Sequence, residues 1–222
     1  GYTTLARYDG GAQEFLTDVS VSPFGGSVFP TNGHTVLDVA PSGRVFVMGY
    51  HDAVAAYTSS GSLDVSWGNA GAAPVGAVRS SVVDSLGRIL LRRTADIVRL
   101  TPDGAVDGNF AFSGAVTTLA AVPGKLYAAA GSSLLVLDET GTPVALPLSP
   151  AAGAILDVAV DPLGRLLIVN SGGQVFRYGS DGSLLGEVGL GEGARRVHCG
   201  ASGGCFVVGR TDAETYVVRL AD

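Results

Sequence analysis

The residues that could do nucleophilic chemistry lie near the C-terminus. The segment GASGG, residues 200–204, matches the pattern G-x-S-x-G, and His198 precedes it by two residues. A nucleophile elbow places its serine between a strand and a helix. Here short apolar runs of strand type lie on both sides of Ser202, and no helical pattern follows. We therefore predict a hairpin turn with a turn serine, and we assign no catalytic residue.

Two further segments and the histidines could hold a phosphate or a metal ion. GLGEGA, residues 189–194, is followed by a strand pattern and not by the helix that a phosphate loop needs. DGAVDGN, residues 103–109, lacks the spacing and the terminal Glu of a calcium loop. The histidines His34, His51 and His198 show no HxH or HExxH spacing. We predict no cofactor and no metal ligand among them, and interpret both segments as turns or loops.

The two cysteines, Cys199 and Cys205, flank one predicted hairpin turn. Residues that face each other on adjacent strands have Cβ atoms about 5 Å apart, which is close to disulfide reach. A free thiol or a metal pair is the alternative. We predict a disulfide, which implies an oxidising compartment and an extracellular or cell-surface location.

The composition excludes some partners. The 222 residues carry a net charge of −6, which argues against nucleic acid, because binding to phosphates rests on clustered cations. No apolar run approaches 18 residues, so no insertion into a membrane is expected. The chain begins without Met and without a signal peptide pattern, so we expect a processed form or an excised domain.

A glycine between two apolar runs recurs along the chain about every 40 residues, as in repeat proteins. It stands at Gly43, Gly87, Gly124, Gly164 and Gly204. A second turn follows each of the first four, at Gly61, Gly104, Gly141 and Gly182. Two short runs rich in Val, Leu, Ile and Tyr separate the two turns, so each unit is predicted to contain four short strands. That period and strand number are typical of a β-propeller blade.

The repeat predicts an all-β fold, a five-bladed β-propeller in a single domain over 1–222, with four short antiparallel strands per blade. The N-terminal closing segment is residues 1–21, and residues 22–33 form a long loop. An N-terminal strand is expected to close the C-terminal blade, because closure leaves no open sheet edge. The blades are predicted at about 36–74, 75–115, 116–154, 155–194, and 195–222 plus the N-terminal strand.

The N-terminal residues supply one strand too many. TTLARY, residues 3–8, and AQEFLTDV, residues 12–19, resemble the third and fourth strands of the unit QVFRYGSDGSLLGEV, residues 174–188. Either TTLARY closes the last blade, or AQEFLTDV closes it and TTLARY extends the sheet or reaches a neighbouring molecule. The second alternative predicts self-association through the N-terminal strand.

Three segments resemble repeats of known families. VAVDPLGRLLIVNSGGQVFRYGSDGSLLGEVG, residues 158–189, resembles an NHL repeat. SGSLDVSWGNAG, residues 60–71, and DGAVDGNFAFSG, residues 103–114, resemble the delta-60 repeat of secreted bacterial propellers. The latter two share an aromatic and an acidic position, occupied by Trp67, Phe110, Asp64 and Asp107. The resemblance implies a propeller but no particular chemistry, because one fold carries many functions.

In propellers that bind ligands, loops at one end of the channel usually make the site. The loops expected there contain the candidate ligand-binding residues Asn32, His34, Asp38, His51, Asp52, Arg92, Arg93, Asp157, Asn170, Arg196 and Arg210. The same loops contain Asp96, Ser132, Glu192, Arg195 and Asp212. Asp38 and Asp157 are expected at equivalent places on two innermost strands.

The expected function is non-catalytic binding or adhesion outside the cell, with a glycan, a peptide or a surface protein as the ligand. One alternative is a metal-dependent hydrolase or lactonase that uses Asp38, Asp157, Asn170 and His51. However, lactonase propellers use a buried Glu near an innermost strand, and no Glu occupies such a place here. The other alternative is a structural module of a surface fibre or of a larger secreted protein.

Overall fold

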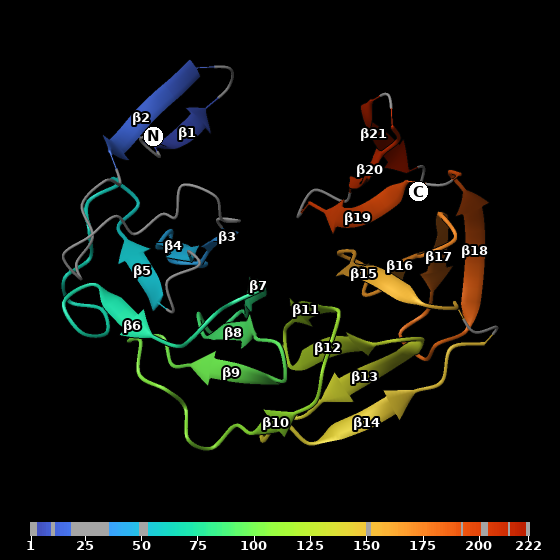
Figure 1. Ribbon diagram of the computed structural model, residues 1–222, viewed down its shortest axis with the longest axis horizontal. Helices are drawn as coiled ribbons and strands as arrows, with labels where there is room; N and C mark the ends of the chain where they lie inside the picture. The colour runs from blue at the N-terminus through green and yellow to red at the C-terminus, as the bar shows by residue number, and fades with distance from the viewer. Residues whose placement is uncertain are drawn as a thin grey trace. The chain divides into compact units, whose positions relative to one another are not determined.

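The computed structural model describes residues 4–9, 12–18, 36–48, 53–149, 152–191, 193–200, 204–212 and 214–220 (Figure 1). It divides into two compact units, residues 1–110 and residues 111–222. Every regular element in the described ranges is a β-strand, so none of them is a helix that could cross a membrane.

The first unit contains an N-terminal pair of strands followed by two antiparallel sheets. Its strands are β1 (Thr4–Asp9), β2 (Ala12–Asp18), β3 (Val36–Val39), β4 (Val45–Met48), β5 (Ala53–Tyr57), β6 (Ala72–Pro74), β7 (Ser80–Val83), β8 (Ile89–Arg92) and β9 (Asp96–Leu100). β1 and β2 pair with each other in antiparallel fashion. β3 to β6 form one antiparallel sheet in chain order, and β7, β8 and β9 pair successively in the next.

The second unit continues the same pattern. Its strands are β10 (Phe112–Ser113), β11 (Thr118–Val122), β12 (Lys125–Ala130), β13 (Ser133–Leu137), β14 (Pro143–Leu146), β15 (Ile155–Val160), β16 (Leu166–Asn170), β17 (Gln174–Tyr178), β18 (Leu184–Gly189), β19 (Ala194–Cys199), β20 (Cys205–Arg210) and β21 (Thr215–Leu220). β11 to β14 and β15 to β18 form four-stranded sheets in chain order, and β19 to β21 form a three-stranded sheet. The predicted succession of strands in sets of four is confirmed.

Two predictions concern the N-terminal part of the chain. TTLARY and AQEFLTDV are both strands, as expected, and they pair with each other as β1 and β2. Closure of the last sheet by one of them would join the two units, and it stays a prediction. The predicted long loop at 22–33 lies outside the described residues.

The first strands of successive sheets lie side by side within each unit. β3 lies beside β7 in the first unit, and β15 lies between β11 and β19 in the second (Figure 1). We call these the innermost strands. The sheets pack through buried apolar side chains, with Phe46 and Trp67 in the first core and Tyr127 and Tyr178 in the second. The innermost strands therefore bring residues from three consecutive repeats together in the second unit.

The first turn of the repeat is fixed by an aspartate and an arginine. Asp161 Oδ1 accepts hydrogen bonds from the backbone N–H groups of Leu163 and Arg165, both at 2.9 Å, and Oδ2 accepts one from Arg165 Nε at 2.5 Å. Asp84 and Arg88 repeat this arrangement in the first unit. The D-x-L-G-R segments are thus turns held by a buried carboxylate.

Replacing Asp161 by alanine is expected to lower the free energy of unfolding by about 2 kcal/mol, because three partly buried donors lose their acceptor. Donors from Arg165 outweigh the effect of burial and hold the pKa of Asp161 below its ordinary value. This stabilisation is present above the unfolded-state pKa and is lost as the pH falls through the lower folded-state pKa. Urea unfolding at several pH values measures both effects. The matched control is Leu163→Ala in the same turn, where the side chain is 77% exposed; an equal loss there would contradict the explanation.

The second turn of the repeat touches the outer segment of the preceding sheet. The Gly68 N–H donates a hydrogen bond to the Asp103 carbonyl at 2.8 Å, and the Ser149 N–H donates one to the Gly182 carbonyl at 3.1 Å. Gly104, in the turn with Asp103, has φ +90°, and a Cβ there would lie 2.7 Å from Trp67 Cε2. The recurring glycine therefore permits both the turn and the close approach of two sheets.

Candidate polar site on the innermost strands

Asp157 connects the three innermost strands of the second unit. It lies on β15 and is only 7% exposed. Its Oδ1 accepts a hydrogen bond from the Thr118 hydroxyl on β11 at 2.7 Å, and its Oδ2 accepts one from the Val197 N–H on β19 at 3.0 Å. One carboxylate thus satisfies a donor from each neighbouring sheet.

The electrostatic environment of Asp157 favours its protonated form more than water does. Burial raises the pKa of this carboxyl above its ordinary value, and hydrogen bonds from Thr118 and Val197 offset only part of that rise. Arg196 offsets a further part, but its Nη1 is 3.7 Å from Asp157 Oδ1 and its side chain is 60% exposed. The ion pair is therefore loose, and Arg196 keeps donors for another partner.

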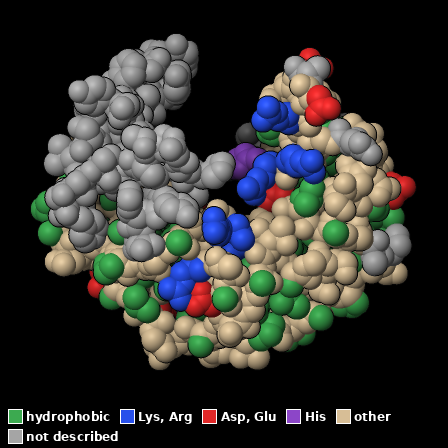
Figure 2. Space-filling view, in the orientation of Figure 1, with side chains coloured by type: hydrophobic (Ala, Val, Ile, Leu, Met, Phe, Trp, Pro, Cys, Tyr) green, Lys and Arg blue, Asp and Glu red, His purple; other side chains and the backbone are tan. Residues whose placement is uncertain are grey.

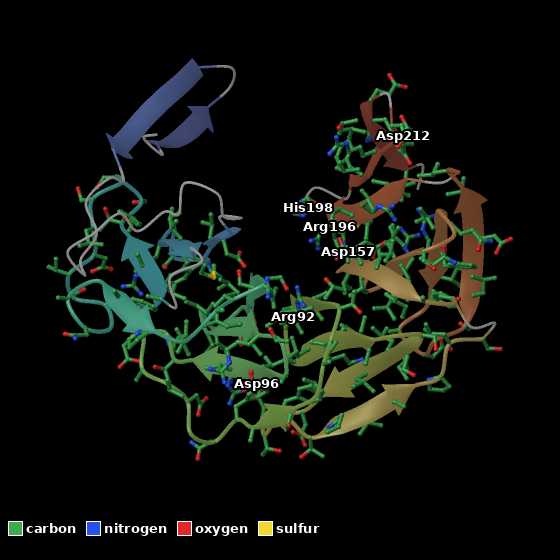
Figure 3. All side chains as sticks on the ribbon, viewed as in Figure 1. Arg92, Asp96, Asp157, Arg196, His198 and Asp212 are labelled. Atoms are coloured by element: carbon green, nitrogen blue, oxygen red, sulfur yellow. A yellow bond between two sulfur atoms is a disulfide. The ribbon has the colours of Figure 1, made fainter. Side chains whose placement is uncertain are left out.

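Arg196 and His198 form an exposed basic pair on β19. Val197 between them is buried, so strand alternation puts Arg196 and His198 on the opposite, solvent-facing side. Figure 3 shows both side chains close to Asp157, and Figure 2 shows basic side chains and a histidine gathered on this part of the surface. This pair, the β19 basic pair, presents a guanidinium and an imidazole to solvent.

Asp38 was expected at the place equivalent to Asp157, and this prediction is wrong. Counted from the hairpin turn, Asp38 belongs to the second cross-strand pair, opposite Phe46. Asp157 belongs to the fourth pair, opposite Val169. Asp38 Oδ1 accepts a hydrogen bond from the Val39 N–H at 2.9 Å. Burial raises the pKa of Asp38. The two hairpin turns have the same length, but Asp38 precedes its turn glycine, Gly43, by five residues, whereas Asp157 precedes Gly164 by seven, so the offset is already present in the sequence.

Arg92 and Arg93, at the end of β8, have hydrogen-bond partners within the first unit. Arg93 Nε donates a hydrogen bond to Asp96 Oδ1 at 2.6 Å, and Arg93 Nη1 donates one to the Val75 carbonyl at 2.9 Å. The hydrogen bond from Arg93 lowers the pKa of Asp96. Arg92 Nε donates to Ser80 Oγ at 2.7 Å. These contacts fix the loop after β8, and Figure 3 shows Arg92 and Asp96 in that part of the chain.

Asn170 is buried and serves the loop between β16 and β17. Its Nδ2 donates hydrogen bonds to the Ala152 carbonyl at 2.8 Å and to Gln174 Oε1 at 3.0 Å. Its Oδ1 accepts hydrogen bonds from the N–H groups of Gly172 and Gln174. The Asn–Ser–Gly–Gly sequence is a turn signal that could have predicted this structural role.

The remaining predicted site residues are exposed or lie outside the described part. Arg210, at the end of β20, and Asp212 are exposed. Asn32, His34, His51, Asp52, Glu192 and Ser202 lie outside the described residues. Sequence reasoning missed Thr118, which begins β11 and could have been found as a polar residue opening an innermost strand. The structure thus brings Asp157, Arg196 and Thr118 together, and the wider ring of loops stays a prediction.

The predicted disulfide is confirmed. Cys199 and Cys205 are bonded, with Cα atoms 4.1 Å apart, and they face each other at the ends of β19 and β20. A disulfide is typical of proteins from oxidising compartments.

Replacing both cysteines by serine is expected to lower the free energy of unfolding by about 2 kcal/mol, because a closed loop restrains the unfolded chain. Thermal unfolding followed by circular dichroism measures the loss. Reduction of the unsubstituted chain is the control and should give a similar change; an unchanged melting temperature in both would contradict the prediction.

Within the described residues, no group of three or more His, Cys, Asp or Glu is placed to hold a metal ion.

Comparison with solved structures identifies the architecture. A streptogramin B lyase has a TM-score of 0.60 and 14% identity, over 83% of this chain and 67% of that one. The WD40 propeller domain of Doa1 has a TM-score of 0.60 and 18% identity, over 81% and 61%. The fold is a β-propeller. A catalytically inactive variant of virginiamycin B lyase from Staphylococcus aureus with quinupristin has a TM-score of 0.61 and 13% identity, over 95% and 74%.

These likenesses confirm the predicted propeller and show the fold alone, because all identities are below 20%. The five predicted blades correspond to the five successive sheets of the described strands, from β3–β6 to β19–β21. The chain spans 61% to 74% of the length of these three propellers. No family model matches the sequence, and no curated protein matches it either.

Proposed function

We propose that the chain is a secreted, non-catalytic binding propeller that recognises a glycan, a peptide or a surface protein at the innermost strands. The observation that carries this proposal is the β19 basic pair, Arg196 and His198, exposed beside a carboxylate that is already satisfied. Asp157 is held by Thr118 and Val197, so it neutralises Arg196 only loosely at 3.7 Å. A guanidinium in this state suits an anionic group such as a carboxylate of the ligand.

Secretion is supported by the disulfide and by the two segments that resemble delta-60 repeats. Trp67 and Phe110 are both buried. Their acidic partners pair with arginines, Asp64 with Arg44 and Asp107 with Arg99, each through an Nε–Oδ2 hydrogen bond of 2.8 Å. The two segments thus use the same residue types in the same structural way, which supports a shared repeat.

Glycan and peptide arrays probed with the purified chain test the proposal. We expect binding to an acidic glycan or peptide, and a loss of at least tenfold in affinity for Arg196→Ala and for His198→Ala, about 1.4 kcal/mol each. The matched control is Lys125→Ala, an exposed lysine at the start of β12, which is not an innermost strand. Binding that is equally weakened by the control, or absent from every ligand, would contradict the proposal.

A second candidate is a lyase, favoured by a buried acid of raised pKa, Asp157, beside the exposed His198. Two of the structural neighbours are lyases by name. Incubation with quinupristin, followed by mass spectrometry, tests this candidate. Cleavage of quinupristin by the unsubstituted chain, lost in Asp157→Asn and in His198→Ala, would favour the lyase over the non-catalytic binding propeller.

The metal-dependent hydrolase receives less support. It would use Asn170 as a ligand, but the Asn170 side-chain oxygen already accepts two backbone hydrogen bonds. Metal analysis of the purified chain, with a thermal shift on adding calcium, zinc or manganese, tests this alternative directly.

A further inference from the structure

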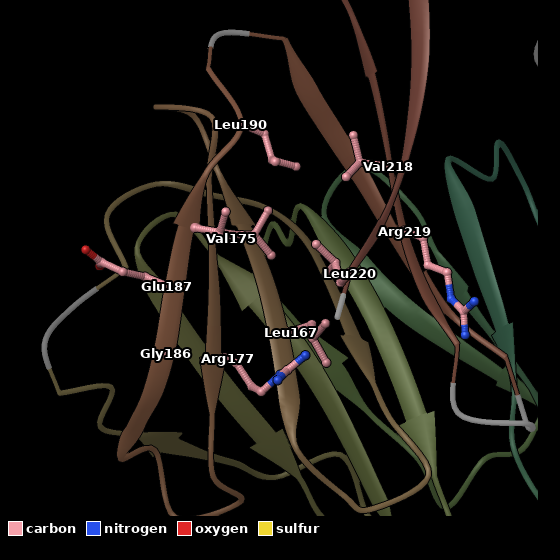
Figure 4. Close-up of a pocket in the computed structure, with 10 residues that line it drawn as sticks. Leu167, Val175, Arg177, Gly186, Glu187, Leu190, Val218, Arg219 and Leu220 are labelled. Carbon is pink, nitrogen blue, oxygen red and sulfur yellow. The ribbon is translucent and has the colours of Figure 1, made fainter. Parts of the chain in front are cut away.

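A cavity of about 300 Å³ lies between the β15–β18 sheet and the β19–β21 sheet, beside β21 (Figure 4). Its apolar lining consists of Leu167, Val175, Val188, Leu190, Val218 and Leu220. Arg177, Glu187 and Arg219 also border it. The cavity is therefore apolar with a charged margin.

Comparison with the preceding pair of sheets explains the cavity. Between the β11–β14 sheet and the β15–β18 sheet, Leu184 on the fourth strand packs into the core together with Tyr178 on the third. In the last sheet, Leu220 on β21 takes the place that Tyr178 has in the preceding sheet. Leu220 pairs with Cys205, the first residue of β20, and Tyr178 pairs with Leu166, the first residue of β16. Among the described strands, the last sheet ends at β21. No described residue therefore takes the place that Leu184 has in the preceding sheet, and the cavity occupies it.

β21 is suited to accept another strand. It is the last of the three strands that the structure describes in its sheet, and an unpaired strand edge can template pairing with another chain. Its residues alternate between half-buried and exposed, with Val218 and Leu220 towards the cavity and Val217 64% exposed. An added strand would gain both backbone hydrogen bonds and an apolar pocket.

The chain itself contains a matching strand. The sequence EFLTDV, which begins in β2, corresponds to SLLGEV in and before β18. In this alignment Phe15 takes the place of Leu184. The register of β17 with β18 pairs Tyr178 with Leu184 and Arg177 with Gly186. If β2 paired with β21 in the register that β18 has with β17, Phe15 would lie opposite Leu220 and Thr17 opposite Arg219.

The charges are also complementary. Glu14 and Asp18 lie on either side of Phe15, Leu16 and Thr17 in β2, whereas Arg219, an exposed arginine on β21 itself, borders the cavity. Opposite charges on paired strands favour the correct pairing and disfavour other registers. Association through this surface should therefore weaken as the salt concentration rises.

We propose that strand β2 of a second copy of this chain pairs with β21 and inserts Phe15 into the cavity. Residues 19–35, between β2 and β3, can span at most about 55 Å when extended, so β2 can reach another molecule. Strand exchange is a low-cost route to association, because the contacts are those of a fourth blade strand. This inference goes beyond the proposed ligand binding, since it uses a different surface.

Light scattering after size exclusion, over a wide range of protein concentration, tests the association. We expect masses that are multiples of the monomer, and a return to the monomer for Phe15→Ala. Val144→Ala is the matched control, because Val144 is an exposed apolar residue on the outer strand β14, and it should leave association unchanged. A monomer at every concentration would overturn the proposal.

Cysteine cross-linking decides whether β2 comes from a second copy, even where Phe15→Ala fails to fold. Thr17→Cys and Arg219→Cys are placed in separate chains, which are mixed and oxidised. A disulfide-linked dimer containing one chain of each kind is the expected result. A cross-link that forms only inside a chain carrying both substitutions, with no mixed dimer, would show closure within one molecule and overturn the proposal.

Discussion

Replacing Gly104 by alanine should lower the free energy of unfolding by about 3 kcal/mol, from left-handed backbone strain and overpacking. Gly104 has φ +90°, where a Cβ meets the backbone. The added Cβ would also lie 2.7 Å from Trp67 Cε2 and 2.8 Å from Gly68 N. Trp67 is 1% exposed and packs on Phe46, with ring centroids 5.4 Å apart, so it has little room to move. Urea unfolding followed by the fluorescence of this tryptophan measures the loss.

Gly124→Ala is the matched control for this experiment. Gly124 has φ +74°, but a Cβ there would meet nothing within 4 Å. Its cost should be limited to the backbone strain, about 1–2 kcal/mol. Equal losses in the free energy of unfolding at the two positions would show that the close contact with Trp67 contributes nothing. Glycine would then be required at position 104 for its backbone conformation alone.

Local signals made the architecture predictable from sequence. Tight turns favour residues such as Gly104 and Gly164, which adopt positive φ. Runs of about five apolar residues between such turns are too short for helices and favour strands. The disulfide was predictable for the same reason, since Cys199 and Cys205 flank a single turn. The turns, the strands and the disulfide all depend on residues that are close together in the sequence.

The candidate site was less predictable because it depends on which strands lie side by side. Asp157 was expected to face a ligand, but it is turned towards donors from two neighbouring strands, Thr118 and Val197. These residues are about 40 positions away on either side, one repeat in each direction. Asn170 was likewise taken for a ligand-binding residue, although its side chain closes its own loop.

The β19 basic pair depends on the same arrangement. Because the carboxylate of Asp157 is engaged by Thr118 and Val197, Arg196 is left with only a loose ion pair. A change at Asp157 should therefore alter both the stability of the fold and the position of Arg196. Comparing substitutions that remove or retain its hydrogen bonds separates the two effects.

Replacing Asp157 by alanine should lower the free energy of unfolding by about 3 kcal/mol, because two buried donors lose their acceptor. Thr118 is 3% exposed and Val197 is 6% exposed, so water cannot easily replace the carboxylate. Asp157→Asn should cost much less, because the amide oxygen can accept from Val197 and the amide nitrogen can donate to Thr118 Oγ1. Chemical denaturation of the three proteins at one pH measures these differences.

The pH dependence of the same variants tests the electrostatic explanation. Burial raises the pKa of Asp157 in the folded chain, so folding favours the protonated carboxyl. The resulting stabilisation is fully present below the unfolded-state pKa, near 3.9, and is lost as the pH rises through the raised folded-state value. Asp157→Asn carries no titrating group, so its stability relative to the unsubstituted chain should increase with pH over this interval and then level off. A difference that falls as the pH rises would show that hydrogen bonds and Arg196 outweigh burial at Asp157, and a constant difference would show that they cancel it. Either result would contradict the electrostatic explanation.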